Sequence, residues 1–470
     1  MRPKINSQSE FNFQPSNLQI TNDYYAKYEA ISAILDEHPE IINAVHQDLA
    51  EALENAAVQD RRGAQFKFTS DTILRIVLCQ IMEGMSLRQI IIRIDDSGFL
   101  RQFVRIYNGP MIDFTAYCKL RNGIRPQTWK KMNDVLARAA VKERWIEGDS
   151  LRIDTTAVET NIHWPTDSSL LWDTYRTLAR SIERIREMDP VVVGERRVLL
   201  KKVKNLQQKI ARKASKNARS AEALKPLYIR LFGLVGNILQ WSDQIAELLA
   251  AKIARHRYGP VEQATIEFCL NDLVRFQTLG RRILDQARRR IMDQETVPNP
   301  EKIFSIFEPH TELLKRGKAG RPIEFGHMIQ IQQVEAKFIT DYQVFDKKPV
   351  EYELLDPTIK SHKQLFGKYP DQLSADKGYY ENMVQIVRLG KIIDVVAINK
   401  KGKRTQEETE RETDPAFRHA QRFRAGVEGT ISFLKRILGL FRCYSKGWEH
   451  YVATVGATVL AHNLLILARC

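Results

Sequence analysis

The sequence predicts a mixed α/β protein in which a sheet-forming core is interrupted by a long helical insertion and preceded by an all-helical region. Three observations lead to this prediction. Strand-like alternation of apolar and polar residues begins near residue 150 and returns after residue 322, whereas the spacing of apolar residues is helical over 23–143 and over most of 167–295. We therefore expect one sheet that is built from two distant parts of the chain.

The first 143 residues are expected to form an arm and a helical domain. Residues 1–22 are polar and rich in Ser, Asn and Gln, which indicates a flexible arm. In 23–143 the stretch "DTILRIVLCQIMEGMSLRQIIIRI" predicts a helix, a break at Gly84 and a second helix that begins at Ser86. This pattern fits a helix-turn-helix DNA-binding domain, but small helical bundles share it.

The sheet-forming core is expected in two parts, 144–166 and 306–470. In the first part Leu151 and Ile153 alternate with polar residues, so Asp154 lies on the face opposite Ile153. The second part contains the strand-like runs "IEFGHMIQIQQVE", "KFITDYQVFD" and "KIIDVVAI", which alternate with helical segments and end in long helices. Residues 167–305, between the two parts, are the helical insertion.

The charge of the chain points to a polyanionic partner. Its 470 residues carry a formal net charge of +15, and nucleic acid is the simplest partner for such a balance. Residues 201–219 hold eight basic and no acidic side chains, and Lys202, Lys209 and Lys216 repeat every seven residues. This helix is expected either to follow a DNA backbone or to be a solvated surface, and its sequence favours neither.

The cysteines and the apolar segments indicate an intracellular protein. Five cysteines lie far apart without a CxxC pair, so neither a zinc site nor a disulfide framework is indicated, and a reducing, cytoplasmic compartment fits. We find no signal peptide and no run of about 18 apolar residues, so no membrane association is expected.

The stretch "RFRAGVEGTISFLKRILG", residues 422–439, places a glutamate beside an apolar helical stripe. Arg424, Glu428 and Lys435 are spaced by four and seven residues, so they lie along one side of a helix. The simplest interpretation is a surface ion pair worth a few tenths of a kcal/mol.

Two other acids lie within or at the end of predicted strands, since Asp154 lies in the first strand and Asp376 ends the run "QLSAD". Side chains at strand ends can project into a cleft at the edge of a sheet.

Three segments together resemble the DDE transposases of bacterial insertion sequences, which have a ribonuclease H-like catalytic core. They are "LRIDTTAVETNIHWPTDSSLLWDTYR", "LSADKGYY" and the C-terminal stretch that begins "RFRAGVEGTISFLKRILGLFRCYSKGWEHYVATVG". The similarity is to the not-yet-classified group of such elements. In that family the first aspartate lies on the first strand, the second ends the fourth strand and the glutamate lies on a later helix, which Asp154, Asp376 and Glu428 match. Arg424 and Lys435 match basic members of the glutamate block, but its leading tyrosine is Gln421 here.

The resemblance implies a site and its partners. Asp154, Asp376 and Glu428 would be catalytic and would hold two Mg²⁺ ions, which Mn²⁺ can replace, because two metal ions stabilise the attacking and leaving oxygens of a phosphodiester. Arg424 and Lys435 would grip DNA phosphates. The expected partners are terminal inverted repeats and target DNA, the expected assembly is a dimer or a larger oligomer on DNA, and no nucleotide cofactor is implied.

Two other functions remain open. The chain could be a captured transposase that binds DNA without catalysis, or a nuclease on the same fold that performs no joining step. The positions of the three carboxylates test the catalytic mechanism, since a shared metal site requires them to converge.

Overall fold

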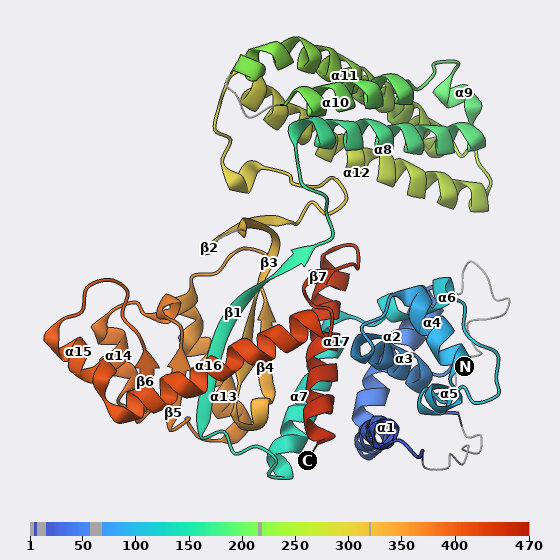
Figure 1. Ribbon diagram of the computed structural model, residues 1–470. Helices are drawn as coiled ribbons and strands as arrows, with labels where there is room; N and C mark the ends of the chain where they lie inside the picture. Colours follow the sequence, from blue (N-terminus) through green and yellow to red (C-terminus); the bar gives the residue numbers. More distant parts are fainter. Residues whose placement is uncertain (1–3, 7–15, 57–67, 215–218, 319–320, 470) are drawn as a thin grey trace. The chain divides into compact units, whose positions relative to one another are not determined.

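The computed structural model describes all residues except 1–3, 7–15, 57–67, 215–218, 319–320 and 470 (Figure 1). It confirms the mixed α/β class. The chain forms two compact units, of which the first comprises Met1–Thr160 and His327–Cys470 and the second Asn161–Gly326. Much of the expected N-terminal arm lies outside the described residues, and the first helix already begins at Gln19.

The described residues form one sheet of seven strands. Its main path has the order β2-β3-β1-β5-β6, with β4 paired to β3 and β7 paired to β1. The strands are β1 (Ser150–Thr160), β2 (Glu312–Lys318), β3 (Arg321–Gln333), β4 (Ile339–Val344), β5 (Gln372–Ala375), β6 (Val395–Ile398) and β7 (Arg442–Cys443).

The middle of the sheet is parallel. In the pairing of β1 with β5, Arg152 lies opposite Ser374, and β5 pairs in turn with β6. The β3 and β4 strands are antiparallel to each other. Because parallel strands end at the same edge, the C-terminal ends of β5 and β6 and the neighbouring part of β1 share one edge of the sheet.

The N-terminal helices share their hydrophobic core with the sheet. Buried residues of α1–α7 belong to the same cluster as those of the strands, and the last helix, α17, contacts α1, α3, α7 and β4. The helices are α1 (Gln19–Glu37), α2 (Pro39–Ala56), α3 (Ser70–Met82), α4 (Leu87–Asp96), α5 (Gly98–Phe103), α6 (Phe114–Asn122), α7 (Pro126–Lys142), α13 (Leu355–Phe366), α14 (Met383–Leu389), α15 (Gln406–Thr413), α16 (Pro415–Arg436) and α17 (Trp448–Leu467). Short 3-10 turns are η3 (Glu335–Lys337), η4 (Glu351–Leu354) and η5 (Lys377–Tyr379).

The predicted break between two helices is present. Gly84 has a positive φ of 62°, which favours glycine, and Ser86 caps α4 with a capping box that includes Gln89. The preceding helix, α3, is capped by Thr69, whose side chain accepts from the Thr72 N–H. The α3, α4 and α6 helices contact one another.

Helix α17 is, among the described residues, the one helix long and apolar enough to cross a membrane. Most of this segment is buried inside the protein, as in the core helix of a globular domain. Its apolar character therefore reflects its central position in the first unit.

The second unit is mainly a helical bundle with its own hydrophobic core. This unit, Asn161–Gly326, is longer at both ends than the expected insertion 167–305. It extends to Gly326 because β2 pairs antiparallel with the first residues of β3. Its helices are α8 (Asp167–Met188), α9 (Pro190–Val193), α10 (Leu200–Lys213), α11 (Arg219–Ala254), α12 (Pro260–Ile291) and the 3-10 turn η2 (Asn299–Glu301).

Close packing at Gly456 generates a stability prediction. A Cβ at this position of α17 would stand 2.3 Å from the Tyr342 hydroxyl and 2.7 Å from Trp129 Cβ. Gly456→Ala should therefore cost about 1–3 kcal/mol and lower the thermal midpoint by several degrees. Gly429→Ala is the matched control, because no neighbouring atom lies within 4 Å and alanine favours a helix. An equal effect of both changes would contradict the packing seen at α17.

Candidate functional site

Asp154 lies in the middle of β1, on the face that α16 covers. Side chains two residues apart in a strand share a face, so Asp154 lies on the same side as Arg152. Arg152 Nη1 donates to the Phe423 carbonyl of α16 at 2.6 Å, and its guanidinium lies 4.4 Å from the Phe423 ring centroid. The Asp154 carboxylate is half-buried and accepts a 2.8 Å hydrogen bond from the Thr155 N–H.

Asp376 directly follows β5, the strand beside β1. If the register of Arg152 with Ser374 is continued by two residues, Asp376 comes opposite Asp154. Its Oδ1 accepts a 2.6 Å hydrogen bond from the Lys377 N–H at the start of η5. The pairing of β1 with β5 thus brings the two predicted acids, Asp154 and Asp376, into one neighbourhood.

The pKa of Asp154 reflects this neighbourhood. Burial raises it from the usual 3.8 to about 6, and the negative charges of Asp376 and Glu351 contribute in the same direction. The Thr155 N–H and the Arg424 guanidinium act against the increase. Asp154 therefore lies within electrostatic range of three charged side chains that come from three different segments.

Helix α16 crosses the sheet and contacts four of its strands (Figure 1). Near its start Gln421 donates to the Ala397 carbonyl of β6 at 2.5 Å and to the Ala375 carbonyl of β5 at 3.4 Å. Further along, Gly426 lies so close to Arg152 that a Cβ would stand 2.2 Å from Nη1. Thr430 then accepts from Gln333 of β3 at 2.9 Å. Gln421 thus anchors α16 to the ends of β5 and β6, beside Asp376.

Glu428 forms the ion pair that the simplest interpretation of its sequence predicts. Arg424 Nη2 donates to Glu428 Oε1 at 3.0 Å, and the Glu428 side chain is 65% exposed. Arg424 is half-buried and also lowers the pKa of Asp154, so its charge acts on both acids. Lys435 lies in the last turn of α16 and is half-buried.

The described residues contain no group of three or more His, Cys, Asp or Glu side chains that could hold a metal ion as they stand. Asp154 and Asp376 supply the carboxylate oxygens that Mg²⁺ prefers, from adjacent strands. Glu428 is engaged with Arg424 instead. The Glu428 side chain is 65% exposed, so water can replace Arg424 as its partner and a change of rotamer at Glu428 costs little. The donor chemistry therefore fits a hard divalent ion, although the three acids do not form one cluster.

A further acid, Glu351, belongs to this neighbourhood and was not predicted. Its Oε1 accepts a 2.5 Å hydrogen bond from the Thr155 hydroxyl, and a Cβ on Gly378 would stand 1.7 Å from its Oε2. Glu351 thus touches the residue after Asp154 and the turn after Asp376. No local sequence signal marks it, because it lies in the short turn η4, outside any regular apolar pattern.

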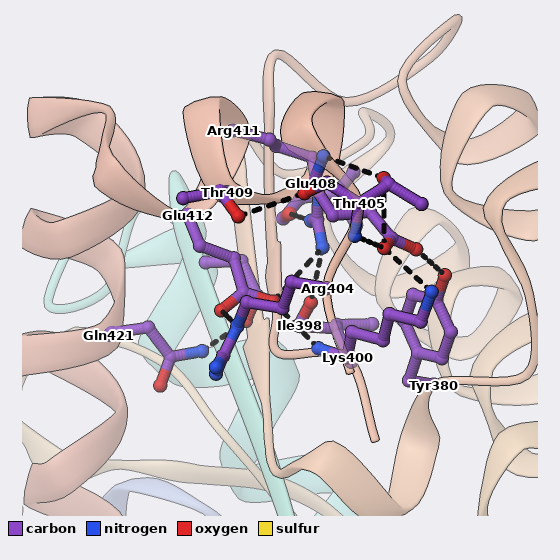
Figure 2. Close-up of polar contacts among 12 residues, drawn as sticks. Tyr380, Ile398, Lys400, Arg404, Thr405, Glu408, Thr409, Arg411, Glu412 and Gln421 are labelled. Carbon is purple, nitrogen blue, oxygen red and sulfur yellow. Dashed lines mark hydrogen bonds and ion pairs between the residues drawn. The ribbon is translucent and has the colours of Figure 1, made fainter. Parts of the chain in front are cut away.

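A polar network borders the site beyond Asp376 (Figure 2). The buried Glu408 of α15 accepts from Lys400 Nζ at 2.6 Å and from the Tyr380 hydroxyl at 2.8 Å, and the hydrogen bond from Lys400 is the main reason why its pKa falls to about 2. Arg411 donates to the carbonyls of Val396 and Ile398 at the end of β6. The network fixes the segment that follows Asp376 against α15.

The basic helix of the second unit is partly described. Lys202 and Lys209 are exposed on α10, while Val203, Leu206 and Ile210 are buried. Lys216 lies outside the described residues.

The raised pKa of Asp154 predicts a pH-dependent gain of stability in Asp154→Asn. At pH 4 the folded carboxyl is protonated and much of the unfolded carboxyl is protonated too, since its pKa is 3.8, so the substitution should change little. Above pH 6 the folded wild type carries a charge that burial disfavours, and Asp154→Asn should then be more stable by about 1–3 kcal/mol.

Thermal unfolding in EDTA from pH 4 to pH 8 tests this expectation. Asp356→Asn is the control, because Asp356 is exposed on α13 and pairs with Arg388 at 2.9 Å. A lower midpoint of Asp154→Asn than of wild type at pH 8 would contradict the assigned cause of the shift.

Comparisons of the chain with protein families, with curated proteins and with solved structures find no match. We therefore argue function from the positions of Asp154, Asp376 and Glu428 and from the chemistry that carboxylates perform there.

Proposed function

We propose that this chain is a DDE DNA transposase with a ribonuclease H-like core. It would bind terminal inverted repeats, cleave DNA to give 3′-hydroxyls, and join them to target DNA by transesterification. The observation that carries the proposal is that β1, which holds Asp154, pairs in parallel with β5, which Asp376 directly follows. The first acid lies on the first strand, the second follows a later parallel strand, and Glu428 lies on the helix that crosses both. These are the places that the family resemblance requires.

In this proposal Asp154 would contribute to both metal sites, and Asp376 and Glu428 to one each. The bound Mg²⁺ ions would supply the positive charge that phosphodiester cleavage and joining need. The raised pKa of Asp154 supports this role, because burial and neighbouring negative charge disfavour a carboxylate that has no cation beside it.

Arg424 would have one partner in the absence of metal ions and DNA and another when both are bound. In the structure its guanidinium pairs with Glu428. If Glu428 held a metal ion instead, the Arg424 guanidinium would be available to bind a DNA phosphate next to the cleaved bond. Lys435, about two turns beyond Glu428 on α16, would contact the DNA backbone as a point charge.

DNA recognition would come from the N-terminal helices, and the chain's charge supports a nucleic-acid partner. The α3 and α4 helices flank the Gly84 turn, as in a helix-turn-helix arrangement. Lys202 and Lys209 of α10 would add contacts without sequence specificity. Because transposition pairs two DNA ends, we expect a dimer or a larger assembly on DNA, in the bacterial cytoplasm and associated with the nucleoid.

The proposed chemistry predicts metal-dependent cleavage and joining that is lost in Asp376→Asn. The assay uses a labelled duplex that carries the end of the DNA element encoding the chain, with Mg²⁺ or Mn²⁺. Loss of a residue that hydrogen-bonds a metal ligand reduces activity roughly 10- to 100-fold. Asp376→Asn removes a direct ligand, so it should reduce the rate of cleavage by more than this. Asp356→Asn, on the exposed side of α13, should retain wild-type activity.

Three outcomes of that assay are informative. Product from wild type and from the control only would support the transposase. Cleavage without joining would favour a nuclease on the same fold. Duplex binding without any reaction, with either metal, would favour a DNA-binding protein that performs no catalysis.

A second prediction separates the roles of Glu428 and Glu351. Glu428→Gln should abolish cleavage and weaken Mn²⁺ binding, which is measured by electron paramagnetic resonance without DNA, because an amide is a poor ligand for a hard ion. Glu351→Gln keeps an oxygen that accepts from the Thr155 hydroxyl, so it should remain active. The reverse result would make Glu351 the third ligand and would remove Glu428 from the site.

A further inference from the structure

The first unit contains a groove of about 930 Å³ that the proposed chemistry does not use. It is lined by the turn between α3 and α4, by α6 from Phe114 to Asn122, by the segment between α16 and α17, and by the first turns of α17. Its volume lies within the range of small-ligand sites. The groove is therefore large enough for a ligand of nucleotide size.

The lining of this groove is strongly basic. Arg88, Arg121, Arg442 and Lys446 line it, and no Asp or Glu is among the described residues that do. Arg442 is paired with Glu159 at 3.0 Å. Within the described part of the chain, no carboxylate forms an ion pair with the other three cations, so their charge is available to a polyanion. The N-terminus of α4 also faces the groove through Leu87 and adds partial positive charge.

Aromatic and apolar groups lie between these cations. The Tyr444 side chain is 73% exposed, and the ring of Phe114 is covered by the Arg88 guanidinium at 4.5 Å. Leu87, Leu438 and Leu440 also line the groove. An exposed aromatic ring among arginines and lysines is the arrangement on which unpaired bases stack while their phosphates are neutralised. A duplex keeps its bases stacked internally and offers no free face to Tyr444.

The groove begins where α16 ends. Leu438, which lines it, is ten residues beyond Glu428, about 15 Å along a helix. One DNA strand advances about 3.4 Å per nucleotide in a duplex, so this separation corresponds to roughly four or five nucleotides. A strand whose reacting bond lies at Glu428 could therefore extend into the groove.

We propose that this groove binds a short single-stranded DNA segment beside the reacting end, with Tyr444 stacking on a base and Arg88, Arg121 and Lys446 contacting phosphates. The inference rests on the proposed function and adds a site for unpaired DNA to it. Such a site would hold the strand in place while the bond at the carboxylates is cleaved or joined.

The test is a binding measurement in EDTA, so it does not depend on catalysis. Fluorescence anisotropy is recorded with a labelled oligothymidine and with a duplex of equal length. We expect wild type to bind the oligothymidine more tightly, and Tyr444→Ala to weaken this binding roughly tenfold, whereas Tyr444→Phe, which keeps the ring, binds like wild type. Lys446→Glu should weaken binding and lower the slope of log K against log salt by about 0.7.

Lys391→Glu is the matched control, because Lys391 is exposed on the turn after α14, outside the groove lining. Unchanged oligothymidine binding in Tyr444→Ala and Lys446→Glu would overturn the inference, and so would an equal loss in Lys391→Glu or no binding by wild type. If these variants bind normally while wild type cleaves and joins DNA, the groove assignment fails and the transposase proposal stands. If oligothymidine binding depends on the groove residues but wild type neither cleaves nor joins DNA, the groove assignment stands and the transposase proposal fails.

Discussion

The arrangement of the candidate site depends on one buried arginine. Arg152 of β1 is 5% exposed and donates to Gln333 of β3 at 2.7 Å and to the Phe423 carbonyl of α16 at 2.6 Å. Burial lowers the pKa of Arg152 to about 10, and both of these acceptors are neutral. Burying a charge is unfavourable unless hydrogen bonds compensate it. The Arg152 side chain thereby links β1 and β3 to α16, the helix that carries Glu428. Gly426 leaves the space that its guanidinium occupies.

The consequence is a fixed direction of α16 across the sheet. Gln421 contacts β5 and β6, Arg152 reaches the helix from β1, and Thr430 contacts Gln333 of β3. These contacts place Arg424 where its charge acts on Asp154, while Glu428, one turn later, faces solvent. Arg152, backbone carbonyls and neutral side chains thus fix the direction of α16, whereas Arg424 and Glu428 can change partners when a ligand binds.

Much of this arrangement could be predicted from the sequence. The strand around Asp154 and the apolar stripe of α16 have regular periods, and Asp376 follows a recognisable strand end. Glu351 could not be predicted, because its contact with Thr155 spans 196 positions and leaves no local pattern. The buried Glu408 was missed for a similar reason, since its partner Tyr380 lies in another segment. The pairing of Arg424 with Glu428 follows from helical spacing, but spacing alone does not tell whether the glutamate also reaches a metal.

The discontinuity of the first unit affects how the chain can fold during synthesis. Ser150 of β1 pairs with Gln372 of β5, 222 residues later, and the whole second unit is made between them. At about 5–20 residues per second, β1 leaves the ribosome roughly 10–45 s before β5. During that interval the strand has no parallel partner, and its apolar residues must be covered by the N-terminal helices or by a chaperone. Completion of the sheet is thus a late, long-range step, and it brings Asp154 and Asp376 together only near the end of translation.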